Sequence, residues 1–301
     1  MNIRSGNRPR VCDELRREVA GRLTPRDRSL CQLLWEHKVL TTNQVCQIAF
    51  DSVNAAQHRL LILHHLRVLD RFRPLRDLGS APFHYVLDEL GAAVVAAEQG
   101  MTVTELGFRH DKVLALAYNE HLPHLVGVNG FFCSLAETAR RRRDAALVEW
   151  SSERRCRLAW GALVRPDGFG RWREGSAEVE FFLEYDAGTE PLARLVAKLD
   201  GYAELAAATQ ISTPTLFWLP GPRREAGLRK ALDRPPVPVA TATAASGRGP
   251  AEAVWLPVGQ TSPRCRLAEL DSWGAPSAIR SARAAGSLAT RSRKKSSQVE
   301  E

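Results

Sequence analysis

The feature that most constrains the fold is a series of three helix-start signals followed by two strand-like runs within the first hundred residues. Thr24-Pro25 combines a capping threonine with a proline in the first turn, and Thr41 to Gln44 has the spacing of a capping box. A third helix is expected after Asp51-Ser52. Strand-like runs at 71–76 and 83–87 flank a loop that contains glycine and proline. This order predicts a winged helix-turn-helix domain over residues 21–100.

In a winged helix the third helix enters the major groove of duplex DNA, and the hairpin lies along the backbone. Polar side chains that can hydrogen-bond to base edges occur on the expected third helix: Asn54, Gln57, His58 and Arg59. Side chains that would contact phosphates occur in the hairpin: Arg71, Arg73 and Arg76. The alternative is a winged helix that only contacts proteins, with these arginines on a solvated strand face.

The charge balance favours a polyanionic partner. The chain has 42 Lys and Arg against 34 Asp and Glu, a formal net charge of +8, which suits nucleic acid or an acidic membrane surface. The six cysteines stand singly, without the Cys-x-x-Cys pairs of zinc or redox sites. No stretch of about eighteen apolar residues is present, so we expect a cytoplasmic protein without a membrane partner.

The chain is long enough for two domains, and its character changes after residue 145. Strand-like runs at 145–150, 161–165, 178–186 and 214–219, with a helix at 190–208, predict a mixed α/β domain. The predicted organisation is a flexible basic arm (1–20), the winged helix (21–100), a linker (101–118), the α/β domain (119–260) and a disordered basic tail (261–301). The fold class is therefore mixed α+β.

Three carboxylates of the second domain form a candidate catalytic and metal site. Asp167 is expected near a strand end, and Glu184 and Asp186 on one face of the next strand, where they could together hold Mg²⁺. The pattern resembles the restriction-endonuclease-like superfamily, whose motif is Pro-Asp followed by Asp/Glu-x-Lys. Asp186 occupies the lysine position here, so Lys198 in the following helix would supply that charge. Alternatively, Asp167-Gly168 is a hairpin turn, and the other two are exposed strand-end residues.

Several short segments together resemble the replication-relaxation family of bacterial plasmid proteins. The resemblance covers roughly residues 24–220 and rests on the order of the segments Val39–Gln44, Phe50, Arg59-Leu60, Leu69–Arg71, Tyr85–Ala92, His124–Leu135, Pro166–Gly168 and Phe182–Thr189. It implies an N-terminal winged helix and involvement in the replication and relaxation of plasmid DNA.

The sequence therefore predicts a protein that binds double-stranded DNA in plasmid replication, relaxation or mobilisation, with replication or mobilisation proteins as partners. One alternative is a Mg²⁺-dependent nicking nuclease that acts on plasmid DNA, and another is a winged-helix transcriptional regulator. His121 and His124 lie three residues apart, and Pro123 between them favours a structural role. The basic run Arg140 to Arg143 suits either phosphate binding or a helix C-terminus.

Overall fold

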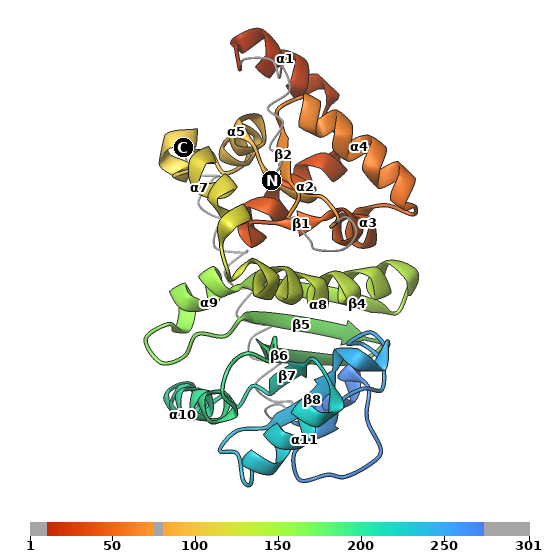
Figure 1. The fold of residues 1–301 in the computed structure, drawn as a ribbon, viewed down its shortest axis with the longest axis vertical. Helices are drawn as coiled ribbons and strands as arrows, with labels where there is room; N and C mark the ends of the chain where they lie inside the picture. The colour runs from red at the N-terminus through yellow and green to blue at the C-terminus, as the bar shows by residue number, and fades with distance from the viewer. Residues whose placement is uncertain (1–10, 75–80, 274–301) are drawn as a thin grey trace, which may run out of the picture.

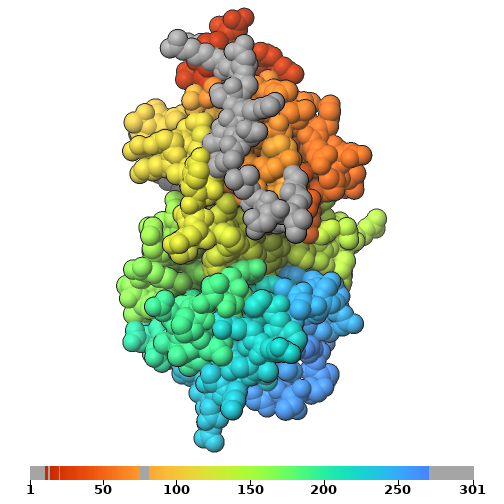
Figure 2. Space-filling view, in the orientation of Figure 1, coloured from red at the N-terminus to blue at the C-terminus, as the bar shows by residue number. Residues whose placement is uncertain are grey.

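The computed structural model describes residues 11–74 and 81–273, in two modules that stack along the long axis (Figure 1). The N-terminal module is mostly helical, and the second is built on a large sheet; the space-filling view shows them in direct contact (Figure 2). The first comprises α1 (Asp13–Arg22), α2 (Pro25–His37), β1 (Leu40–Thr41), α3 (Thr42–Ala49), α4 (Val53–His65), β2 (Leu69–Phe72), β3 (His84–Leu87), α5 (Glu89–Glu98), α6 (Val103–Leu106), α7 (His110–Leu114) and the 3₁₀ turn η1 (Ala115–Tyr118).

The predicted helix starts are confirmed, because each has the expected cap. In α2 and α3 the capping boxes are complete: Thr24 pairs reciprocally with Asp27, and Thr41 with Gln44. The Ser52 side chain caps α4. The strands β1, β3 and β2 form a small antiparallel sheet in that order. Strand β2 ends at Phe72, earlier than predicted, since Pro74 soon follows and has no N–H to donate to a ladder.

The second module is a six-stranded mixed sheet with helices on both faces. The strand order is β4-β5-β6-β7-β8-β9, parallel between β6, β7 and β8 and antiparallel elsewhere. Its elements are α8 (Leu122–Arg141), β4 (Ala145–Ser152), α9 (Glu153–Trp160), β5 (Gly168–Glu174), β6 (Ala177–Tyr185), α10 (Leu192–Thr209), β7 (Thr215–Leu219), α11 (Pro222–Ala231), β8 (Val239–Thr243), η2 (Ala244–Ser246), β9 (Leu256–Pro257) and η3 (Leu267–Trp273).

Successive side chains along each strand point to opposite faces of the sheet, so this module has one hydrophobic core on each face. Phe181 and Leu183 of β6 pack with Phe131 of α8, whereas Phe182, between them, packs with Leu199 and Tyr202 of α10. Helix α8 thus covers one face of the sheet, and α10 and α11 cover the other. This arrangement brings the ends of β5 and β6 close to α8 and α10.

Several predicted boundaries differ from the structure. Helix α1 begins inside the predicted arm and buries Val19, and residues 103–118 of the predicted linker form short helices. The predicted disordered tail begins too early, because Cys265 pairs with Trp255, and Leu267 and Leu270 are buried. The expected strand at 161–165 is a turn after α9. Residues 274–301 and Arg76 lie outside the described residues.

The two modules meet through polar and aromatic contacts. The imidazole of His37 stacks on Trp150 of β4, with 3.7 Å between the ring centroids. The burial of this imidazole lowers the pKa of His37 to about 3. The amide of Asn129 on α8 donates to the backbone oxygens of His37 and Val39, at 3.1 and 2.7 Å. Glu36 accepts from Ser152 and Arg154. No described helix is long and apolar enough to cross a membrane.

Candidate functional site

Helix α4 presents a polar outer face. Asn54, Gln57 and His58 are exposed, while Ala56 and Leu60 on the opposite side are buried in the module core. The turn before α4, residues 50–52, joins it to α3. The three polar side chains that the sequence assigns to base contacts are therefore accessible.

Arg59, which the sequence groups with these side chains, is instead held inside the module. Its Nη2 and Nε donate to the buried carboxylate of Asp27, at 2.5 and 3.0 Å, and Nη2 also donates to the backbone oxygen of Arg22. The hydrogen bond with Asp27 raises the pKa of Arg59. This corrects the expected role of Arg59: its guanidinium joins α4 to α2, because a buried carboxylate requires a partner.

The arginines of the hairpin share one aromatic platform. The guanidinium groups of Arg71 and Arg73 lie 4.1 and 3.9 Å from the ring centroid of Phe83, across the hairpin. Stacking on the ring leaves the in-plane N–H groups of a guanidinium available for other acceptors. These two positions thus form a compact basic site at the base of the hairpin.

A second site lies where β5 begins and β6 ends. Glu184 of β6 is buried, and its carboxylate accepts from Lys198 Nζ at 2.6 Å and from the Tyr202 hydroxyl at 2.5 Å, both on α10. Asp167, just before β5, accepts from the backbone N–H of Tyr185 at 2.8 Å. The structure thus brings Asp167, Glu184 and Lys198 to one region, as the sequence predicts.

The third predicted carboxylate, Asp186, is engaged elsewhere. It accepts from Arg224 Nε of α11 at 2.6 Å and from the backbone N–H of Gly188 at 2.8 Å. The sequence contains no local signal for this pair, because Arg224 lies 38 residues further along the chain. The predicted set of three converging carboxylates is therefore reduced to Asp167 and Glu184.

His124 of α8 is a site residue that the sequence interpretation missed. Its Nε2 lies 3.1 Å from Asp167 Oδ1, and its ring meets the Tyr185 ring edge-on. Gly127 permits this approach, since a Cβ there would lie 2.2 Å from Cζ of Tyr185. The side chain of His124 is 36% exposed and, with Asp167, lines a cavity of about 100 Å³. The spacing from His121 and the segment resemblance both drew attention to His124, but the sequence favoured a structural role.

The electrostatics of this site differ from those of an ordinary ion pair. Burial, and next the negative charge of Asp167, raise the pKa of Glu184 to about 7. Burial alone would lower the pKa of Lys198, but the charges of Glu184 and Asp167 raise it, so this amine stays protonated. The hydrogen bond from His124 to Asp167 raises the pKa of His124. Glu184 and His124 therefore both hold a proton more tightly than they would in water.

The carboxylates of Asp167 and Glu184 are engaged by protein donors in this arrangement. Each of their four oxygens accepts from one of His124, Tyr185, Lys198 and Tyr202, so Mg²⁺, which requires near-octahedral oxygen coordination, would have to share or displace these donors. Among the described residues, the group with ligand atoms close enough to share an ion is Asp70, Asp88 and His110. Arg67 there donates to Asp88 at 2.8 Å.

Comparison with known proteins gives one match. The family described as replication-relaxation matches residues 32–217, well over half of the chain, so the chain belongs to the replication-relaxation family. Membership suggests a role in plasmid replication or relaxation. No curated protein and no solved structure matches the chain.

Proposed function

We propose that this chain binds double-stranded DNA during plasmid replication, relaxation or mobilisation, and that residues 21–100 are its winged helix-turn-helix. The observation that carries the proposal is the exposed polar face of α4, which follows a short turn after α3 and precedes a hairpin with two arginines at its base. The net charge of +8 supports a polyanionic partner.

In this proposal the two elements have different roles. Asn54 and Gln57 reach base edges in the major groove, where an amide can pair bidentately with adenine. Arg71 and Arg73 contact phosphates beside the groove and fix the register without reading sequence. Strand β2 follows α4 directly and packs against it, so both elements can meet one duplex.

The test is an electrophoretic shift of duplex DNA by the full chain at several salt concentrations. Replacing both Arg71 and Arg73 by Gln should weaken binding to all sequences and reduce the salt slope by about two. Asn54→Ala or Gln57→Ala should cost about 1–3 kcal/mol at a preferred site only. Arg109→Gln removes an exposed charge in the same module and serves as the control. Absence of binding at low salt, or binding insensitive to salt, contradicts the proposal.

A second candidate function is phosphodiester cleavage by the second module. One observation favours it: Asp167, Glu184 and Lys198 gather at one edge of a sheet whose strands β4, β5 and β6 lie between helices α8 and α10, with the short α9 inserted between β4 and β5. That order and placement are similar to the restriction-endonuclease-like superfamily. Lys198 and His124 could contact the anionic oxygens of a phosphodiester, and Glu184 could exchange a proton.

Supercoiled plasmid, incubated with the full chain in Mg²⁺, in Mn²⁺ and in EDTA, tests this candidate. The cleavage proposal predicts conversion to relaxed circles by the wild type and its loss in Asp167→Ala and Glu184→Ala. Equal conversion by all three proteins indicates a contaminant, and no conversion by the wild type removes the candidate. Either result leaves the DNA-binding proposal intact, because that proposal rests on the first module.

A further inference from the structure

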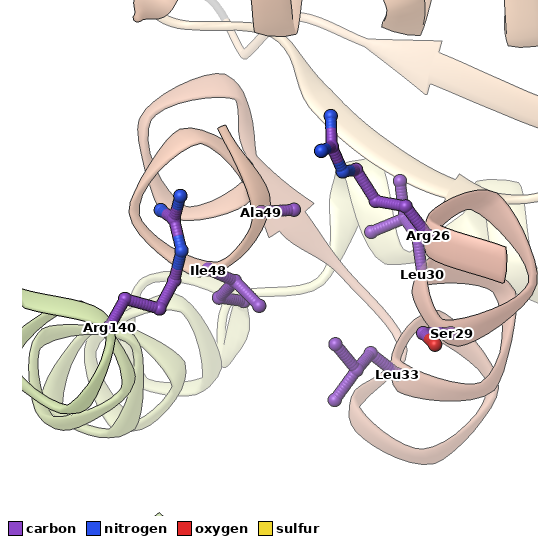
Figure 3. A pocket seen from close by; sticks show the side chains of 7 residues that line it. All are labelled: Arg26, Ser29, Leu30, Leu33, Ile48, Ala49 and Arg140. Carbon is purple, nitrogen blue, oxygen red and sulfur yellow. The ribbon is translucent and has the colours of Figure 1, made fainter. Parts of the chain in front are cut away.

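Arg140, near the end of α8, reaches out of the second module into the helix-turn-helix of the first. Its Nη1 donates to the backbone oxygens of Cys46, Gln47 and Phe50, at 3.3, 3.0 and 3.1 Å, and its Nη2 donates to Asp51 Oδ1 at 2.7 Å. Figure 3 shows the side chain extending from α8 toward α3, beside Ile48. One guanidinium therefore binds the last turn of α3 together with Phe50 and Asp51 of the turn to α4.

The chemistry of this contact explains why an arginine is needed. The last carbonyls of a helix lack partners within the helix, and their dipoles favour a cation. A guanidinium is a planar fork with several N–H groups, so it can serve three carbonyls and a carboxylate at once, whereas a lysine amine is a point charge with three donors. Only one third of the Arg140 side chain is exposed.

The turn held by Arg140 sets the angle between the two helices. Residues 50–52 contain the C-cap of α3, Phe50, and the N-cap of α4, Ser52. The same face of α8 also binds α3 through Glu137, which accepts from Gln47 at 2.9 Å. The second module thus supports α3 and the start of α4 directly.

We propose that Arg140 is a positioning residue for DNA recognition, through which the second module fixes the orientation of α4. This inference rests on the proposed DNA-binding function and goes beyond it, because Arg140 acts through the turn and not through a DNA contact. It also separates Arg140 from its neighbour Arg141, whose side chain is 76% exposed and pairs with Glu137 on its own helix.

The experiment compares the full-length wild type with Arg140→Ala, Arg140→Lys and the matched control Arg141→Ala. Binding is measured to a duplex selected from random sequences by the wild type, and to a random duplex. Arg140→Ala should lose about tenfold in affinity for the selected duplex, with the random-duplex affinity and the salt slope unchanged. Arg140→Lys should lose less, and Arg141→Ala should leave the ratio of the two affinities unchanged.

Hydrogen exchange gives a second measurement that needs no DNA. The backbone amides of residues 50–55 should exchange faster in Arg140→Ala than in the wild type or in Arg141→Ala, because the turn loses its support. Unchanged exchange, or an unchanged affinity ratio, overturns the inference while the proposed function stands. Equal losses on both duplexes with a salt slope lower by about one would make Arg140 a phosphate contact. If the wild type binds no duplex at all, the proposed function fails and this inference fails with it.

Discussion

Asp27 in the first module and Glu184 in the second are both 1% exposed, and each has a cationic partner within 2.6 Å, yet their pKa values move in opposite directions. Burial would raise the pKa of Asp27, but hydrogen bonds from Arg59 and Thr24 outweigh it and lower the pKa. For Glu184 burial dominates, the nearby Asp167 adds to it, and the pKa rises to about 7. A cationic neighbour alone does not keep a buried carboxylate charged. The carboxylate stays charged when enough hydrogen bonds stabilise its ionised form and no second negative charge lies nearby.

The difference separates a carboxylate that stays charged from one that holds a proton more tightly than it would in water. Asp27 stays charged and joins α2 to α4, so its contribution is to stability. The raised pKa of Glu184 lies near neutral pH, a value that suits acid or base chemistry. Three measurements test this contrast.

The largest expected effect is on the stability of the first module. Asp27→Asn should lower the free energy of unfolding by about 3–5 kcal/mol, because it leaves Arg59 without its charged partner in a partly buried site. Urea denaturation, followed by tryptophan fluorescence, measures the loss. Asp51→Asn, at a fully exposed carboxylate that also pairs with an arginine, should cost well under about 1 kcal/mol. An equal loss of unfolding free energy in Asp27→Asn and Asp51→Asn would show that the buried pair stabilises the fold no more than the exposed pair.

A medium effect is expected in the pH dependence of stability. Because the pKa of Glu184 is raised from its ordinary 4.5 to about 7, the folded state holds this proton more tightly than the unfolded state. The resulting stabilisation is fully present below pH 4.5 and is lost as the pH rises through 7. Asp27 has a lowered pKa, so it stabilises the folded state at pH values above its ordinary pKa of 3.8. This stabilisation is lost on acidification.

Urea midpoints between pH 5 and 8 measure this dependence. The decline in wild-type stability with rising pH should be smaller in Glu184→Gln, and Asp200→Asn, at an exposed carboxylate, should retain it in full. A parallel decline in the wild type and Glu184→Gln would show that Glu184 is ionised throughout this range.

The smallest effect concerns two histidines, one in each module. Hydrogen bonds to Asp70 and to Asp167 raise the pKa of His110 and of His124, respectively. In an NMR titration of the histidine ring protons, Asp70→Asn should lower the pKa of His110 and leave His124 unchanged, and Asp167→Asn should lower the pKa of His124 and leave His110 unchanged. Each variant is the control for the other, and a shift of both histidines in either variant would indicate a general change in structure.

The sequence predicts features that depend on neighbouring residues better than features that depend on residues far apart in the chain. The caps at Thr24, Thr41 and Ser52 are local, so the helix starts were predictable. Lys198 was placed with Glu184 because the restriction-endonuclease-like motif requires a lysine and Asp186 occupies its usual position. The Arg59–Asp27 and Asp186–Arg224 pairs join residues more than thirty positions apart, and composition or spacing cannot select such partners.

The predicted tail shows the same limit at the other end of the chain. Leu267 and Leu270 are two apolar residues in a polar segment, too few to indicate a packed element by periodicity. They are buried because the sheet face beside Trp255 is available to cover them, which is a property of the assembled module. Similarly, His124 is unremarkable in its helix until β5 brings Asp167 to it.

Strand β4 is the first strand of the large sheet, so among residues 11–74 and 81–273 one of its edges has no strand partner. Unprotected edges of this kind promote pairing between chains and aggregation. Here α2 packs against β4, His37 stacks on Trp150, and Glu36 binds Ser152 at the end of the strand. The N-terminal module therefore also protects the sheet from self-association, and a fragment that begins at residue 119 would expose this edge together with the indole of Trp150.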